Sequence, residues 1–119
     1  MYKPFHLIGL ELNISVLSAA LCGQPTGTTQ QFTGDVVAVA KRDIRAGEVL
    51  DGEGGYTVWG KLYPAAKSVA ENALPIGLAH QVKLTSDILA GHTICWSDVA
   101  IDKDNSAVQM RLAQQNQLA

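Results

Sequence analysis

The residue types best able to do chemistry gather in one glycine-rich stretch in the middle of the chain. It sets two carboxylates and an aromatic ring among three glycines: Asp51, Gly52, Glu53, Gly54, Gly55 and Tyr56. Glycine permits backbone conformations that other residues resist, so this stretch, the loop 51–56, is expected to be mobile or sharply folded. Paired carboxylates can carry out acid–base chemistry or hold a cation, but the same residues also make an ordinary solvated turn. The sequence leaves both interpretations open.

Residue spacing argues against the familiar kinds of catalytic and metal site. The three histidines, His6, His80 and His92, are far apart, whereas zinc ligands normally come in pairs a few residues apart. The loop 51–56 lacks the alternating oxygen ligands of a calcium loop, and it does not open a helix after a strand as a dinucleotide-binding loop does. The apolar surroundings of His80 favour a histidine satisfied by backbone groups. We therefore predict no catalytic, cofactor-binding or metal-ligating residue in this chain.

The bulk composition limits the size and the partners of the protein. The chain has 119 residues, enough for one domain, and its net charge of −2 comes with scattered Lys and Arg. We therefore expect neither a nucleic-acid partner nor a membrane partner. Cys22 and Cys95 are far apart without metal-site spacing, which indicates reduced thiols and a cytoplasmic protein. Trp59 and Trp96 are expected to be core or interface anchors.

A helix is predicted at residues 7–21, where apolar residues recur at helical spacing. The candidates for an interface on it are Leu10, Ile14, Leu17 and Leu21. Polar residues occupy little more than one narrow stripe, so this helix needs cover on more than one side. A small domain can hardly provide that cover, which indicates another subunit or the rest of a longer protein. A helix lying in a groove of its own domain is the alternative.

An internal repeat is the most informative feature of the chain. Residues 43–50 (DIRAGEVL) return 44 positions later as residues 87–94 (DILAGHTI). In each copy a glycine, Gly47 or Gly91, is expected to take a backbone conformation that a residue with a Cβ would resist. The isoleucine of each copy should anchor its turn to the core. Two copies fit a pseudo-symmetric β domain in which each half contributes one strand-turn-strand unit.

The remaining elements complete a fold class that is mainly β with flanking helices. Strands are expected at 35–41 and 56–62, one or two helical turns at 67–73, and a C-terminal helix at 107–115. Ser106 matches the first position of a capping box before that last helix.

Two sets of motifs resemble known families. The repeated Asp-Ile-x-Ala-Gly turn, with residues 94–99 (ICWSDV), resembles the SAF domain of antifreeze-like proteins, sialic acid synthases and sugar-acid dehydratases. The longer runs 46–62 (AGEVLDGEGGYTVWGKL) and 73–80 (ALPIGLAH) are similar to the C-terminal region of predicted homoserine dehydrogenases, a family that includes reductoisomerase-like enzymes. Residues 2–11 (YKPFHLIGLE) resemble that family's segment just before the SAF region.

The resemblance implies a SAF-type β-clip fold and a division of the chain. Residues 1–24 would be a helical segment belonging to or contacting the upstream catalytic domain, 25–34 a linker, 35–102 the SAF-like β domain, and 103–119 a C-terminal helix and tail. In that family an N-terminal domain binds NAD(P), and no part of this chain matches it. The chain is thus expected not to be an enzyme by itself.

The function that the resemblance implies is that of a non-catalytic accessory domain. It would mediate assembly or homo-oligomerisation and cap the upstream oxidoreductase domains, with the loop 51–56 reaching toward the active site of the intact protein. The alternative is a small-molecule module for a sugar acid or a sugar phosphate, as in the SAF domains of sialic acid synthases and sugar-acid dehydratases.

Overall fold

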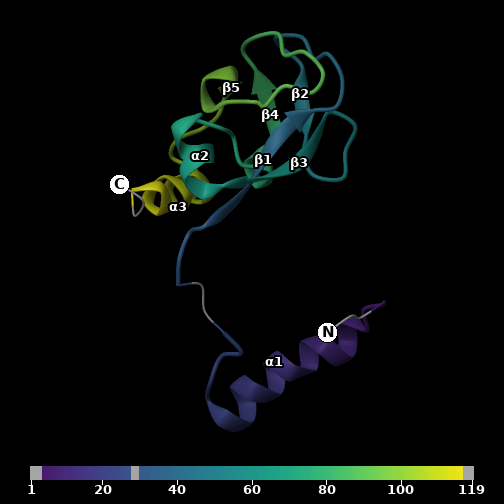
Figure 1. Ribbon diagram of the computed structural model, residues 1–119, viewed down its shortest axis with the longest axis vertical. Helices are drawn as coiled ribbons and strands as arrows, with labels where there is room; N and C mark the ends of the chain where they lie inside the picture. The colour runs from purple at the N-terminus through teal and green to yellow at the C-terminus, as the bar shows by residue number, and fades with distance from the viewer. Residues whose placement is uncertain (1–3, 28–29, 117–119) are drawn as a thin grey trace. The chain divides into compact units, whose positions relative to one another are not determined.

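The computed structural model describes residues 4–27 and 30–116, and the chain divides into two compact units, Met1–Gln31 and Phe32–Ala119. Both units are shown in Figure 1. Parts of four predicted segments lie outside the described residues: the start of the helical segment 1–24 and of the family-like segment 2–11, positions 28 and 29 of the predicted linker, and the end of the predicted tail.

The first unit is built on one helix, α1 (Ile8–Cys22), close to the predicted range. Glu11 closes its first turn, because its Oε1 accepts a hydrogen bond from the backbone N–H of Leu7 at 3.1 Å. The helix ends where Gly23 takes a left-handed conformation with φ of 65°, which glycine adopts without steric penalty. The chain then folds back, and Gln24 N donates to the carbonyl of Ser18.

The second unit contains a long antiparallel ribbon of β1 (Gly34–Ala40) and β3 (Val58–Pro64). Its register pairs Gly34 with Pro64 and Ala40 with Val58. Both faces of this ribbon contribute to hydrophobic clusters, because the buried residues of β1 alternate between them. The prediction that this β-branched run forms a buried strand is therefore confirmed.

A second antiparallel sheet has the order β2-β4-β5, with β2 (Val49–Asp51), β4 (His80–Leu84) and β5 (Val99–Ala100). The β2–β4 register shifts between Leu50 and Asp51, and Gln81 on the opposing strand has φ of 56°. The main core lies between the two sheets and includes Ile44, Leu50, Leu74, Leu84 and Ile94, each at most 1% exposed.

The two copies of the repeat brace each other. Ile44 and Ile88 exchange two backbone hydrogen bonds of 2.8 Å. The carboxylate of Asp43 accepts from the backbone N–H of Ala90, in the turn of the other copy, and Asp87 accepts likewise from Ala46, both at 2.8 Å. The copies differ afterwards, since the strand expected after the second turn is reduced to isolated bridges at Thr93 and Cys95.

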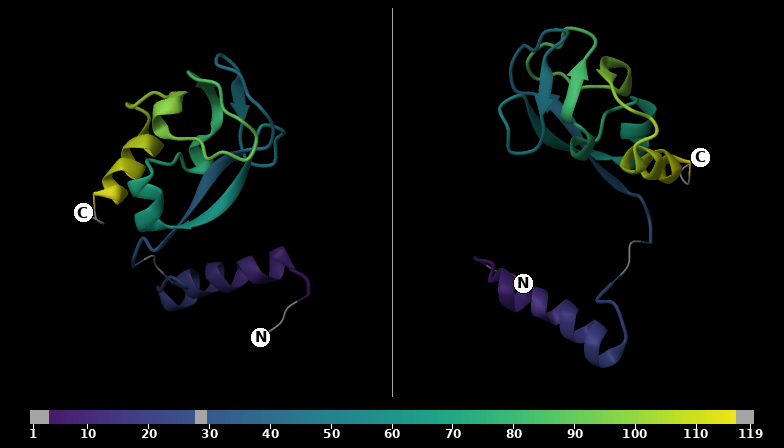
Figure 2. Two further views of the ribbon diagram at one scale, coloured as in Figure 1. Left: turned by 45° about the horizontal axis from the view of Figure 1, so that its top comes forward. Right: turned by 180° about the vertical axis from the view of Figure 1, so that it is seen from behind.

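Two helices lie side by side at one end of this unit, α2 (Ala65–Ala70) and α3 (Ser106–Gln115) (Figure 2). A buried ion pair joins α3 to β1, because Arg111 donates from both terminal nitrogens to the carboxylate of Asp35. The hydroxyl of Ser68, on α2, donates to the same carboxylate. The N-cap of α3 corrects the sequence prediction by one residue: Asn105, rather than Ser106, accepts from Ala107 N at 2.9 Å.

The described residues therefore form a small α+β architecture of two antiparallel sheets and three α-helices, together with two short 3-10 turns (Ile76–Leu78 and Trp96–Asp98). In the described part of the chain, no helix is both long and apolar enough to cross a membrane.

Candidate functional site

The loop 51–56 connects β2 to β3 in a tight turn. Gly52 and Gly54 have φ of 79° and 78°, in the left-handed region that favours glycine. The turn closes where the backbone N–H of Gly55 donates to the carbonyl of Gly52 at 3.2 Å. The loop is thus sharply folded, one of the two forms that its glycines allow.

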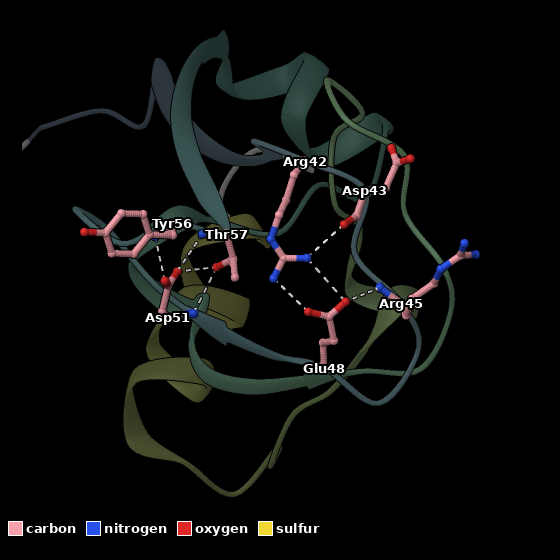
Figure 3. Close-up of polar contacts among 7 residues, drawn as sticks. All are labelled: Arg42, Asp43, Arg45, Glu48, Asp51, Tyr56 and Thr57. Atoms are coloured by element: carbon pink, nitrogen blue, oxygen red, sulfur yellow. Dashed lines mark hydrogen bonds and ion pairs between the residues drawn. The ribbon is translucent and has the colours of Figure 1, made fainter.

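Asp51 organises this loop from within (Figure 3). Its carboxylate accepts backbone hydrogen bonds from Tyr56 at 2.6 Å and from Thr57 at 3.0 Å, and a further one from the Thr57 hydroxyl. The Thr57 hydroxyl and the two N–H groups stabilise the charged form, so the pKa of Asp51 falls to about 2. Asp51 is therefore ionised at neutral pH and its acceptor sites are occupied by the loop itself, which does not suit a general acid or base.

Neighbouring side chains hold the loop against the rest of the unit. The ammonium of Lys41 donates to the carbonyl of Gly55. His80 Nδ1 lies 3.1 Å from the carbonyl oxygen of Asp51, and because a carbonyl oxygen can only accept, this nitrogen donates the hydrogen bond. His80 is thus engaged by a backbone group, as its apolar context predicts. A Cβ on Gly55 would lie 2.2 Å from Asp51 Cγ, so only glycine fits at that position.

The part of the loop that faces solvent consists of Glu53 and Tyr56. Tyr56 is 87% exposed, and Glu53 is exposed at the tip. The two carboxylates of the loop therefore serve different purposes, since Asp51 shapes the backbone and Glu53 is presented outward. What the loop offers to a partner is one carboxylate and one aromatic ring.

A network of charged residues surrounds the first repeat turn, and the sequence reasoning missed it. Arg42 pairs with Glu48 at 2.7 Å, and Glu48 also accepts from Arg45 N at 2.7 Å (Figure 3). The Arg42 guanidinium, with help from that N–H, lowers the pKa of Glu48. Arg45 in turn pairs with Asp87 of the second copy at 2.7 Å, and the pKa of Asp87 is lowered chiefly by the Ala46 N–H and then by Arg45. The sequence signal for this network is the acidic residue that stands three positions after Arg45.

The network holds the turns in place. Each carboxylate in it accepts from a backbone N–H as well as from an arginine. The glycines of the two turns, Gly47 and Gly91, have φ of 91° and 81°. The arrangement is thus a pair of turns capped by side chains, in which the carboxylates of Glu48 and Asp87 bind backbone N–H groups.

Helix α1 is exposed on all its apolar sides within its own unit. The interface candidates Leu10, Ile14, Leu17 and Leu21 are 66%, 64%, 54% and 78% exposed. None of the 15 residues of α1 is buried. The next residues of the chain contact the polar stripe of the helix: Ser18 Oγ donates to the carbonyl of Gln24 at 2.8 Å, and Ser15 Oγ lies 3.0 Å from the Thr26 hydroxyl.

The residues that could support redox or metal chemistry are dispersed. Among residues 4–27 and 30–116, no group of three or more His, Cys, Asp or Glu side chains is placed to hold a metal ion. Cys22 is exposed and Cys95 is half-buried, and both are free thiols. Burial raises the pKa of Cys95, which lowers its thiolate fraction and hence its reactivity.

No protein-family model matches the chain, and no curated protein matches it significantly. The observations that bear on function are therefore the folded loop 51–56, the exposed helix α1, and the surface of the second unit.

Proposed function

We propose that the chain is a non-catalytic assembly module, in which α1 is the docking element for the upstream domains of a larger oxidoreductase or for a second copy of the chain. The observation that carries this proposal is the exposure of seven large apolar side chains along one 15-residue helix: Ile8, Leu10, Leu12, Ile14, Val16, Leu17 and Leu21. Burying such side chains contributes about 1.5–3 kcal/mol each, so their burial would yield on the order of 10 kcal/mol.

The polar groups of α1 support the same proposal. Ser15 and Ser18, on the polar stripe, already bond to residues 24–26 of the same chain. Glu11 is the single charged residue of the helix, and it bonds to the backbone of Leu7. A partner that covered the apolar sides would thus meet few polar groups that need new hydrogen bonds.

The motif resemblance supports a parent of the homoserine-dehydrogenase-like kind and a SAF-type β-clip fold for the second unit. In that setting the NAD(P) chemistry would belong to the parent, and the exposed Glu53 and Tyr56 would be the loop residues able to reach toward its active site. Neutralising Glu53 in the intact enzyme would then change its kinetics; unchanged kinetics would remove the loop from the proposal.

Multi-angle light scattering tests the assembly role. The chain is measured alone over a range of concentrations, and then mixed with the N-terminal part of its parent protein. We expect a discrete oligomer or a tight complex, and we expect the variant with Leu10, Ile14, Leu17 and Leu21 all changed to Ser to lose it. Leu62→Ser with Met110→Ser is the matched control, because these side chains are similarly exposed, at 73% and 75%, but lie outside α1.

A chain that stays monomeric at every concentration and does not bind the N-terminal part of its parent protein would overturn the assembly role.

The second candidate function is that of a module that binds a sugar acid or a sugar phosphate. It is favoured by a pocket of about 370 Å³ on the second unit, large enough for a small ligand. Thermal-shift measurements with sugar acids and sugar phosphates test it, because a ligand that binds only the folded state raises its melting temperature.

A further inference from the structure

The pocket of about 370 Å³ lies beside α3, away from the loop 51–56. Part of its wall is apolar and comes from Trp96, Val99 and Leu112. Another part is polar and comes from Asn72, Lys103 and Gln115. Ligand sites of this size typically combine apolar walls with a small number of polar groups that fix orientation.

The charge in this wall has one sign. Lys103 is the only charged residue among those that line the pocket, and no acidic side chain lines it. Within the described residues, the ammonium of Lys103 forms no ion pair, and the side-chain amides of Asn72 and Gln115 form no hydrogen bond to one another or to the backbone. An anionic group would meet a cation and uncommitted donors there, whereas a cationic ligand would meet Lys103 without compensation.

Trp96 adds an independent observation. Its Nε1 is shielded from solvent and has no hydrogen-bond partner among the described residues, and Arg111 Nε is the other side-chain nitrogen in that condition. Buried donors are nearly always paired in folded proteins, and the Trp96 N–H is an exception that lacks an acceptor. Because Trp96 lines the pocket, an oxygen of an occupant could supply that acceptor once the wall shifts enough to uncover the N–H.

We propose that this pocket binds a small organic carboxylate with a flat, apolar body. The carboxylate pairs with Lys103 and accepts hydrogen bonds from the amides and from Trp96 Nε1. The flat body contacts Val99 and Leu112. This site is independent of the assembly role, because none of its residues belongs to α1.

Nuclear magnetic resonance can observe the site directly in the full-length chain. The chain has two tryptophans, so a nitrogen–proton correlation spectrum contains two indole N–H signals, and Trp59→Phe assigns them. Trp59 does not line the pocket and serves as an internal reference. Titration with benzoate is expected to shift the Trp96 signal and to leave the Trp59 signal in place.

Two comparisons test the role of charge. Benzamide, which has the same ring without the charge, is expected to bind at least about tenfold more weakly, because it loses a charge-assisted hydrogen bond. Lys103→Met should weaken benzoate binding by a similar factor, while Lys61→Met, at an exposed lysine outside the pocket, should leave it unchanged.

Three results would overturn this proposal. The first is a Trp96 signal that does not move up to about 10 mM benzoate, a concentration that reveals even millimolar affinity. The second is an equal response to benzoate and benzamide. The third is a response to glucuronate but not to benzoate, which would favour the sugar-acid module over a flat apolar ligand. None of them bears on light scattering, so the assembly role is judged separately.

Discussion

The buried pair of Asp35 and Arg111 leads to the most demanding prediction about stability. The two residues are 76 positions apart in the sequence, and their side chains are 7% and 9% exposed. Arg111 bonds to Asp35 through two nitrogens, and its guanidinium carbon also lies 4.6 Å from the centroid of the Phe32 ring. Changing Arg111 to Met removes the cation but leaves the carboxylate buried with the Ser68 hydroxyl.

We expect Arg111→Met to lower the free energy of unfolding by about 3–5 kcal/mol, because breaking a buried pair leaves an uncompensated charge. Arg111→Lys keeps the charge but loses the two-pronged geometry and the stacking on Phe32, so its loss should be smaller, about 1–3 kcal/mol. Replacing the whole cluster, with Arg111→Met, Asp35→Leu and Ser68→Ala together, should recover most of the stability, since apolar substitutes for a buried pair are often neutral.

The assay is urea denaturation of the full chain followed by tryptophan fluorescence, because both tryptophans lie in the second unit. If the free energy of unfolding falls with urea concentration at the same slope in each variant, the variants unfold between the same folded and unfolded states. Arg45→Met is the control, because it removes an exposed ion pair whose arginine side chain is 76% exposed, and it should shift the midpoint much less. The reasoning is refuted if Arg111→Met costs less than about 1 kcal/mol, or if the triple change is as damaging as the single one.

Three further predictions concern the loop and the helix. The pKa of Asp51 is lowered from 3.8 to about 2, so the contribution of Asp51 to the free energy of unfolding is complete above pH 4 and is lost as the pH falls to 2. The urea midpoint should therefore drop over that pH range. The drop should be smaller in Asp51→Asn than in Glu53→Gln, which keeps Asp51. Equal acid sensitivity in the two variants would contradict this. Gly55→Ala should destabilise the chain by about 2–3 kcal/mol in the same assay, because the new Cβ meets the Asp51 carboxylate. Gly77→Ala is the control and should change the stability by no more than about 0.5 kcal/mol, because the space around Gly77 is open. Similar losses in the two variants would contradict the loop geometry. Finally, residues 32–119 produced alone should unfold with the same midpoint as the full chain, since this unit is compact by itself. A large loss would show that α1 stabilises the second unit.

Local elements followed the sequence closely. The apolar spacing before Gly23 predicted α1, and the β-branched run after Gly34 predicted β1, to within a residue or two. Each repeat turn contains a glycine, Gly47 or Gly91, that takes a positive φ, as the sequence predicts. These features depend on neighbouring residues, whose types already limit the backbone conformation.

Interactions between distant residues could not be predicted in this way. The loop 51–56 presents two carboxylates in sequence, yet Asp51 turns inward to its own backbone and Glu53 does not. The cap of α3 differs from the expected one by a single residue, because Asn105 and Ser106 are both good capping residues and the position of the helix decides between them.

The sequence by itself determined that the chain has an apolar helix with one narrow polar stripe, a repeated glycine turn and a glycine-rich connection between strands. The tertiary structure alone decided that each repeat caps the turn of the other, that Arg111 reaches Asp35, and that Trp96 and Lys103 line one pocket. The reason is physical: backbone preferences act over a few residues, whereas ion pairs, caps and pockets depend on where packing brings residues that are tens of positions apart.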